Sequence, residues 1–176
     1  MGAYLLILLA VLSRVVPHAW MNFTAVGAGL LYFGARRPLR EAIWPVLALM
    51  GTDVYLTIGF YHYPWHTSGY LITWAWYAAV LVLGRILLSG HMNVTRVIGA
   101  PVIASTSFFL ISNYAVWIGS VMYPHSLAGL DACYAAALPF YRNDVLSTTL
   151  ITGLAFGLPL MARRLAEQRA HGKLAT

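Results

Sequence analysis

Charged side chains are scarce in this chain of 176 residues. Lys and Arg number 11, Asp and Glu number 5, and together they make up 9% of the sequence, against about 25% in a typical soluble domain. Hydrophobic residues make up 60%, and the mean hydropathy is +0.72. This composition argues against a soluble domain and predicts a protein that lies in a lipid bilayer, where polar groups away from water tend to be kept for a function.

Cysteine is nearly absent as well. Cys133 stands alone, so no disulfide can form within the chain, and no CxxC or HExxH motif supplies metal-ligand spacing. His62 and His66 are four residues apart, but Pro64 between them disfavours a regular helix. The sequence has neither a nucleophile elbow nor a glycine loop of the kind that holds phosphate. We therefore predict no metal, no cofactor and no enzymatic activity.

The hydrophobic runs predict an all-α, polytopic membrane bundle of about six transmembrane helices. The expected helices cover residues 2–16, 22–35, 41–60, 69–89, 96–119 and 145–162. They form a single domain, 1–162, and a basic cytoplasmic tail follows, 163–176. Residues 127–140 are expected to hold a further short helix in the membrane surface, which Pro139 would end.

Lys and Arg are distributed unevenly between the two sides of this predicted bundle. Nine fall on one side: Arg36, Arg37, Arg40, Arg85, Arg96, Arg163, Arg164, Arg169 and Lys173. Arg14 and Arg142 fall on the other. Because basic connections stay on the cytoplasmic side, we expect both termini in the cytoplasm. The basic residues are spread over three segments, so nucleic acid is not an expected partner.

Polar and aromatic residues gather in the connections on the opposite, external side. Four of the six histidines lie there, whereas an interfacial belt of Trp and Tyr should form on both sides of a bilayer. This asymmetry indicates a binding mouth for a small molecule at the external face. An inert external belt is the alternative.

Asp53 lies inside the third predicted helix, where a carboxylate is costly and tends to be functional. Arg14 and Arg142 are the external cations that could neutralise it. We expect the three groups to be electrostatically linked, either at a ligand site or as a pairing that holds helices together.

Asn113 and Trp117 are four residues apart and share one face of the fifth predicted helix. We expect them, with Tyr123, to line an outward-facing cavity between the first, third and fifth helices and the segment 120–144. A few fixed polar groups among aromatic walls are typical of small-molecule pockets. The alternative is a filled core with these residues at the lipid headgroups.

Small residues four apart predict where helices approach closely. Such pairs are Gly153 and Gly157, Ala100 and Ala104, and Ala25 and Gly29. We expect them to pack against other helices of the same chain.

Two stretches carry a resemblance to a known family. The first is Arg14-Val-Val-Pro-His18 with Asn22-Phe-Thr-Ala-Val-Gly-Ala and Leu31-Tyr-Phe-Gly34. The second is Ser107-Phe-Phe-Leu-Ile-Ser-Asn113-Tyr-Ala-Val-Trp117 with Tyr123-Pro124, Cys133-Tyr134 and Pro139-Phe-Tyr-Arg-Asn143. With Asp53 and Gly84-Arg85, they resemble an uncharacterised family of small bacterial multi-pass membrane proteins. That family is similar in fold to the substrate-binding S components of energy-coupling-factor (ECF) vitamin transporters.

The resemblance implies a multi-pass protein of the bacterial inner membrane that captures a small, vitamin-like organic molecule at its external face. Its partners would be the lipid bilayer, the unknown ligand, and ECF-type scaffold and ATPase subunits. The implied ligand-binding residues are Arg14, His18, Asn22, Asp53, Asn113, Trp117, Tyr123, Arg142 and Asn143.

The chain departs from the S components in two places. Ala3 and Ala10 are seven residues apart, whereas the S components dock their scaffold through alanines four apart. Position 2 is Gly2 rather than the histidine of the metal-type S components, so nickel and cobalt are unsupported.

The alternative function is that of a non-catalytic accessory subunit of a larger membrane complex.

Overall fold

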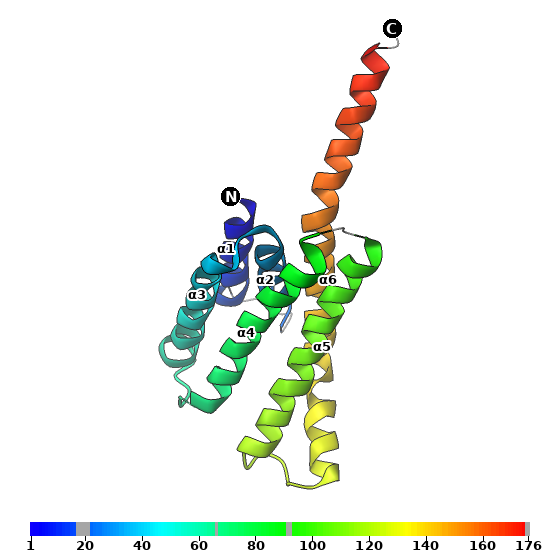
Figure 1. Cartoon of the computed structure of the whole chain (residues 1–176). Coiled ribbons are helices and arrows are strands. Elements are labelled where there is room, and N and C mark those ends of the chain that lie inside the picture. Colours follow the sequence, from blue (N-terminus) through cyan, green and yellow to red (C-terminus); the bar gives the residue numbers. More distant parts are fainter. Residues whose placement is uncertain (17–21, 66, 91–92, 175–176) are drawn as a thin grey trace.

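The computed structural model describes residues 1–16, 22–65, 67–90 and 93–174, with side chains as far as Met161 except those of Ser68 and Leu160. Within this part of the chain the structure is all-helical and has no strand (Figure 1). The α-helices are α1 (Gly2–Val15), α2 (Val26–Arg36), α3 (Ile43–Val54), α4 (Thr67–Leu88), α5 (Val94–Gly119) and α6 (Leu127–Leu174). A 3₁₀ turn, η1 (Leu39–Glu41), precedes α3, and a π-helical turn, η2 (Tyr55–Phe60), continues it. The predicted all-α class is confirmed.

The short helix α2 lies at the centre of the fold. It contacts α1, α4, α5 and α6, and nine of its eleven residues are buried. Its start is fixed to the end of α1, because the Ser13 hydroxyl accepts a hydrogen bond from the Ala25 backbone N–H at 3.0 Å. A helix of this kind is buried all round because small and apolar residues occupy every face.

Two glycines allow α2 and α4 to come into backbone contact. A Cβ atom at Gly34 of α2 would lie 1.9 Å from the backbone oxygen of Leu81, and one at Gly84 of α4 would lie 2.2 Å from that of Leu31. Both distances are far shorter than any van der Waals contact. The crossing of α2 and α4 therefore requires glycine at both positions, as at other closely packed membrane helices.

Among the described residues, three helical segments are long and apolar enough to cross a membrane: Leu39–Phe60, Gly69–Leu88 and Val94–Gly119. Helix α1 is apolar but shorter. Large apolar side chains such as Leu5, Ile86 and Leu150 are exposed on the surface of the bundle. A soluble protein rarely exposes apolar surface on this scale, whereas a lipid-facing bundle must.

The expected interruption at Pro139 is wrong. Helix α6 continues from Leu127 to Leu174 over 48 residues, with Pro139 and Pro159 inside it. The segment expected to form a loop and a surface helix is thus the first part of the last long helix, and the connection before it is only 120–126. Proline is tolerated inside helices of membrane proteins, where neighbouring groups satisfy the backbone oxygen that it leaves free.

Some of the predicted small-residue pairs lie at helix contacts, and one does not. Ala100 and Ala104 are fully buried, and Gly29 lies against the backbone of Leu6, as predicted. In contrast, a Cβ atom at Gly153 or Gly157 would meet nothing within 4 Å. That pair is therefore not a contact within the chain as the described residues show it.

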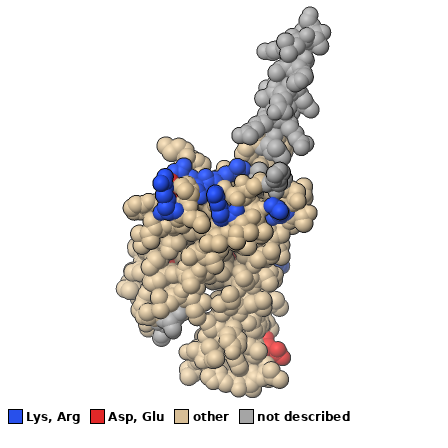
Figure 2. Space-filling view, in the orientation of Figure 1, with Lys and Arg blue, Asp and Glu red and all other residues tan. Residues whose placement is uncertain are grey.

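The arginines form a band across one end of the bundle (Figure 2). The connection between α2 and α3 supplies Arg36, Arg37 and Arg40, and the ends of α4 and α5 nearest their connection supply Arg85 and Arg96. Arg37 holds Glu41 with two hydrogen bonds, of 2.7 and 2.9 Å, and the Tyr4 hydroxyl donates to the same carboxylate at 2.6 Å. These contacts attach the start of α1 to the arginine band.

We expect Gly34→Ala and Gly84→Ala each to lower the free energy of unfolding by about 2 kcal/mol or more, because overpacking costs about 1–3 kcal/mol even where side chains can shift and here backbone atoms would collide. Denaturation in mixed detergent micelles measures the loss. Gly157→Ala is the matched control, and we expect it to be neutral. Unchanged stability of Gly34→Ala would show that the crossing is wider than described.

Candidate functional site

Two adjoining cavities lie away from the arginine band. The first, of about 260 Å³, lies between α5 and α6 and reaches their connection. The second, of about 240 Å³, lies between α1, α3, α4 and the same pair of helices. The two share Asn22, Phe108 and Asp144 on their walls.

The second cavity is built around the carboxylate of Asp53. This residue is only 3% exposed, and its Oδ1 lies 2.6 Å from the Arg14 guanidinium. Trp74 donates to Oδ2 at 2.9 Å, and the Tyr77 hydroxyl lies 3.2 Å from it. A second guanidinium nitrogen of Arg14 donates to that hydroxyl at 3.2 Å. The charge of Asp53 is thus neutralised and fully hydrogen-bonded, which a buried carboxylate requires.

This arrangement confirms the expected link between Arg14 and Asp53. Arg14 lies in the last turn of α1, Asp53 near the end of α3, and Trp74 and Tyr77 are three residues apart on one face of α4. One buried charge pair thereby joins three helices. Arg14 and Asp53 also line the second cavity. The same ion pair therefore both holds helices together and forms part of a cavity wall.

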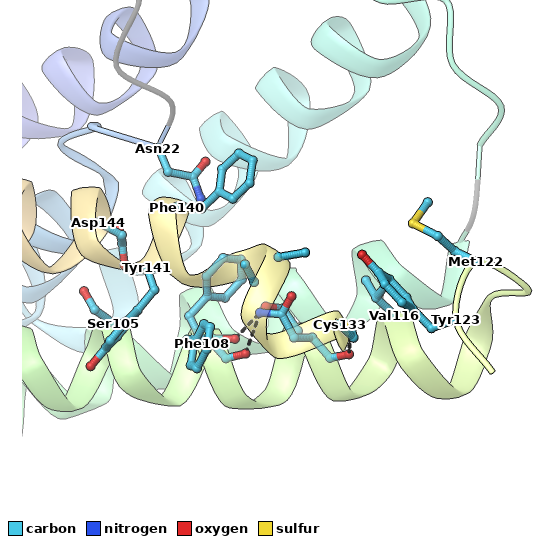
Figure 3. A pocket seen from close by; sticks show the side chains of 15 residues that line it. Asn22, Ser105, Phe108, Val116, Met122, Tyr123, Cys133, Phe140, Tyr141 and Asp144 are labelled. Carbon is cyan, nitrogen blue, oxygen red and sulfur yellow. Dashed lines mark hydrogen bonds between the residues drawn. The ribbon is translucent and has the colours of Figure 1, made fainter. Parts of the chain in front are cut away.

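The first cavity has a polar cluster at one end. Figure 3 shows Ser105 of α5 with Tyr141 and Asp144 of α6 at this end, and Met122 and Tyr123 of the connection at the other. Aromatic rings from both helices line the space between, among them Phe108 and Phe140. The remaining lining residues are Asn22, Phe109, Ser112, Asn113, Val116, Cys133, Ala136 and Ala137.

Several polar groups of this cavity are held by their own helices. The Asn113 amide donates to the backbone oxygen of Phe109 at 2.7 Å, and Ser112 donates to that of Phe108 at 2.6 Å. The Tyr141 hydroxyl pairs with the Thr106 hydroxyl at 2.9 Å, and its ring lies 4.6 Å from that of Phe109. These contacts fix the orientation of the wall before any ligand arrives.

An aromatic cluster lies beside the second cavity. The rings of Trp65 and Tyr70 stack at 4.1 Å with an angle of 4°, and the ring of Trp74 lies 6.1 Å from both. The Tyr70 hydroxyl is hydrogen-bonded to Thr57, within the π-helical turn η2. Turns of this type recur at functional sites because they redirect the side chains that follow.

Most of the predicted site residues that the structure describes lie at these cavities. Arg14 and Asp53 line the second, Asn113 and Tyr123 line the first, and Asn22 lines both. Asn22 has a positive φ of 57°, a conformation that asparagine tolerates better than most residues. The predicted residue His18 lies outside the described residues.

Trp117 and Arg142 are not where we expected them. The Trp117 indole donates to the backbone oxygen of Pro124 at 2.9 Å and packs against His125, so it secures the connection and does not line the first cavity. Arg142 is exposed and forms no ion pair with Asp53 among the described residues. Residues two apart on a helix point about 200° apart, so Arg142 faces away when Asp144 faces the cavities. Asn143 lines neither cavity.

Among the residues of the cavity walls that the sequence did not predict are Ser105, Phe108, Tyr141 and Asp144. The helical spacing of Tyr141, Asp144 and Thr148, which share one face of α6, is a signal for the last two. The expected helix end at Pro139 hides it. No group of three or more His, Cys, Asp or Glu side chains that could hold a metal ion occurs among the described residues.

We expect Asp53→Asn to lower the free energy of unfolding by about 3 kcal/mol, because removing one partner of a buried ion pair leaves the Arg14 charge uncompensated, at a cost of about 3–5 kcal/mol. Denaturation in mixed micelles measures the change. Asp131→Asn, which alters an exposed carboxylate, is the control and should change stability little.

Combining Asp53→Asn with Arg14→Gln should cost less than the sum of the two single changes, because both remove the same interaction. Equal and small effects of Asp53→Asn and Asp131→Asn would contradict the assignment of Asp53 as the buried charge that joins α1, α3 and α4.

The model of a family described as of unknown function, DUF6580, matches residues 1–170. The match covers nearly the whole chain, so the protein belongs to this family. No curated protein and no solved structure matches the chain.

Proposed function

We propose that this member of DUF6580 is an integral membrane protein that binds a small organic molecule in its two adjoining cavities. The observation that carries the proposal is the pair of adjoining cavities, which share Asn22, Phe108 and Asp144 on their walls. The chain would act as a non-enzymatic capture protein, as the S components of ECF transporters do, and deliver its ligand to scaffold and ATPase subunits.

The chemistry of the walls supports a ligand more than it supports packing. Aromatic and apolar side chains supply most of the surface, and Ser, Asn, Tyr and Asp side chains converge on it. Small-molecule sites usually combine these two kinds of wall. In a chain with only five acidic residues, the presence of two of them at these cavities, Asp53 and Asp144, is a costly arrangement that packing alone does not require.

The band of arginines supports an orientation for this site. Basic connections stay on the cytoplasmic side, so the arginine-rich end would face the cytoplasm of a bacterial cell and both termini would lie there. The first cavity extends to Met122 and Tyr123 in the connection at the opposite end. The ligand would then enter from the external side of the membrane.

Cysteine accessibility in intact cells tests this orientation. In a Cys133→Ala background, we expect Val121→Cys, which lies in the exposed connection between α5 and α6, to react with a membrane-impermeant maleimide. His171→Cys should react only after the cells are permeabilised, because the positive-inside rule places it in the cytoplasm. Labelling of position 171 in intact cells would reverse the orientation.

Blocking the first cavity tests the binding function. Native mass spectrometry of the protein purified from its native membranes should show a bound small molecule. We expect Ala137→Trp, which places a ring in the cavity, to lower its occupancy about tenfold or more, a loss equivalent to about 1.4 kcal/mol of contact.

Ala135→Trp is the matched control, because Ala135 lies on the same helix, is exposed and does not line the first cavity. Thermal unfolding of both variants checks that they fold. Two results would contradict the capture function: a wild-type protein without a bound molecule, or an Ala137→Trp variant that retains the molecule. Either result would favour the alternative role of an accessory subunit.

A further inference from the structure

We infer that the ligand carries an organic cation, a protonated amine or a quaternary ammonium, and that Asp144 is the residue that selects it. This inference rests on the proposed function and adds to it the chemical class of the ligand.

The first argument is the charge balance of the cavity walls. Asp53 and Arg14 neutralise each other at 2.6 Å, and Trp74 and Tyr77 complete the hydrogen bonds of that carboxylate. Apart from Arg14, no Lys or Arg lines either cavity among the described residues. The carboxylate of Asp144 therefore gives the adjoining cavities one uncompensated negative charge.

The second argument is that the Asp144 carboxylate has weak hydrogen bonds and no ion pair among the described residues. Its Oδ1 receives a long hydrogen bond, of 3.5 Å, from the Thr148 hydroxyl one turn further along α6. The described residues place no cation in ion-pair contact with it, and Arg142 is exposed on another face of the helix. Asp144 is half-buried. A carboxylate that is largely removed from bulk water is stabilised by a partner of opposite charge, which a bound cation would supply.

The third argument is the Ser105 hydroxyl, at the same end of the first cavity (Figure 3). Ser105 is 1% exposed, and its hydroxyl interacts with the Asp144 carboxylate without forming a hydrogen bond of ordinary geometry to any described residue. A buried hydroxyl without a well-formed hydrogen bond is unusual and costly. Because a hydroxyl oxygen accepts hydrogen bonds, it would serve as a second acceptor for a ligand N–H group beside Asp144.

The aromatic rings of the same wall favour a cation as well. Phe108 lines both cavities. Phe109 and Tyr141 also line the first cavity, and their rings are tilted by 30° with centres 4.6 Å apart. Ring faces attract ammonium groups and repel carboxylates. A ligand with a cationic head and an apolar body would thus match both the charged end and the aromatic length of the cavity.

Three benzyl compounds that differ in charge test the inference: benzylamine, benzyl alcohol and benzoate. Thermal unfolding of the full chain in dodecyl maltoside, a detergent without charge or amine, gives their affinities. We expect benzylamine to bind at least about tenfold more tightly than benzyl alcohol, the equivalent of 1.4 kcal/mol, and benzoate to bind most weakly.

Asp144→Asn should remove this preference and bring benzylamine to the affinity of benzyl alcohol. Ser105→Ala should weaken benzylamine binding by about threefold to tenfold, as the loss of one hydrogen bond does, without removing the preference for a cation. Asp131→Asn, an exposed carboxylate on the same helix, should leave both affinities unchanged. If Asp144→Asn fails to fold, Asp144→Glu, which keeps the charge, should retain the preference for benzylamine.

Occupancy by the natural ligand provides a second readout. In native mass spectrometry, Asp144→Asn should lose the bound molecule that the wild type and Asp131→Asn retain. Addition of phosphatidylethanolamine distinguishes the two sources of an ammonium group, because it competes with benzylamine only if a lipid headgroup occupies the site.

Several results would overturn the inference. They are equal binding of the three compounds, preference for benzoate, no benzylamine binding to the wild type, or retention of the natural ligand by Asp144→Asn. If Asp144→Asn retains the natural ligand and Ala137→Trp loses it, the proposed function stands and only the inference that the ligand is a cation is wrong.

Discussion

The ion pair of Arg14 and Asp53 is the interaction on which the arrangement of α1, α3 and α4 depends. Its partners come from the ends of α1 and α3, and two ring side chains of α4 complete it. Separation of these helices would expose an unpaired charge to an apolar environment, a larger cost than the loss of any single apolar contact. Arg14 is also the only Lys or Arg that lines these cavities among the described residues, and Asp53 already neutralises it.

The thin helix α2 sets the other constraint. Backbone contact at Gly34 and Gly84 brings α4 against it. On another face, a Cβ atom at Gly27 would lie 2.7 Å from the Thr148 side chain of α6. The helices are thus drawn together around α2, which contacts α1, α4, α5 and α6. The first cavity lies between α5 and α6, and the second lies between α1, α3, α4 and the same two helices.

The sequence predicted features that depend on local hydrophobicity and charge, and it missed features that depend on which helix faces pack together. Hydrophobic length predicted the all-α class. The cost of a buried carboxylate predicted Arg14 as a partner of Asp53, but also Arg142, which forms no ion pair with it among the described residues. A single proline could not show that α6 continues, because the groups that satisfy the freed backbone oxygen come from elsewhere in the fold. Trp117 shares a face with Asn113, yet its long side chain reaches the backbone of Pro124 instead.

The polar end of the first cavity supports the proposed binding site over a packing defect. An empty apolar void persists in proteins at a modest cost, but a void lined by polar groups takes up water or a ligand that satisfies them. Ser105 and Asp144 lie at such a void, on two helices that aromatic contacts and the Trp117 hydrogen bond already hold in place. The walls are therefore preorganised, and a ligand that supplies the missing donor and charge would lose little to rearrangement.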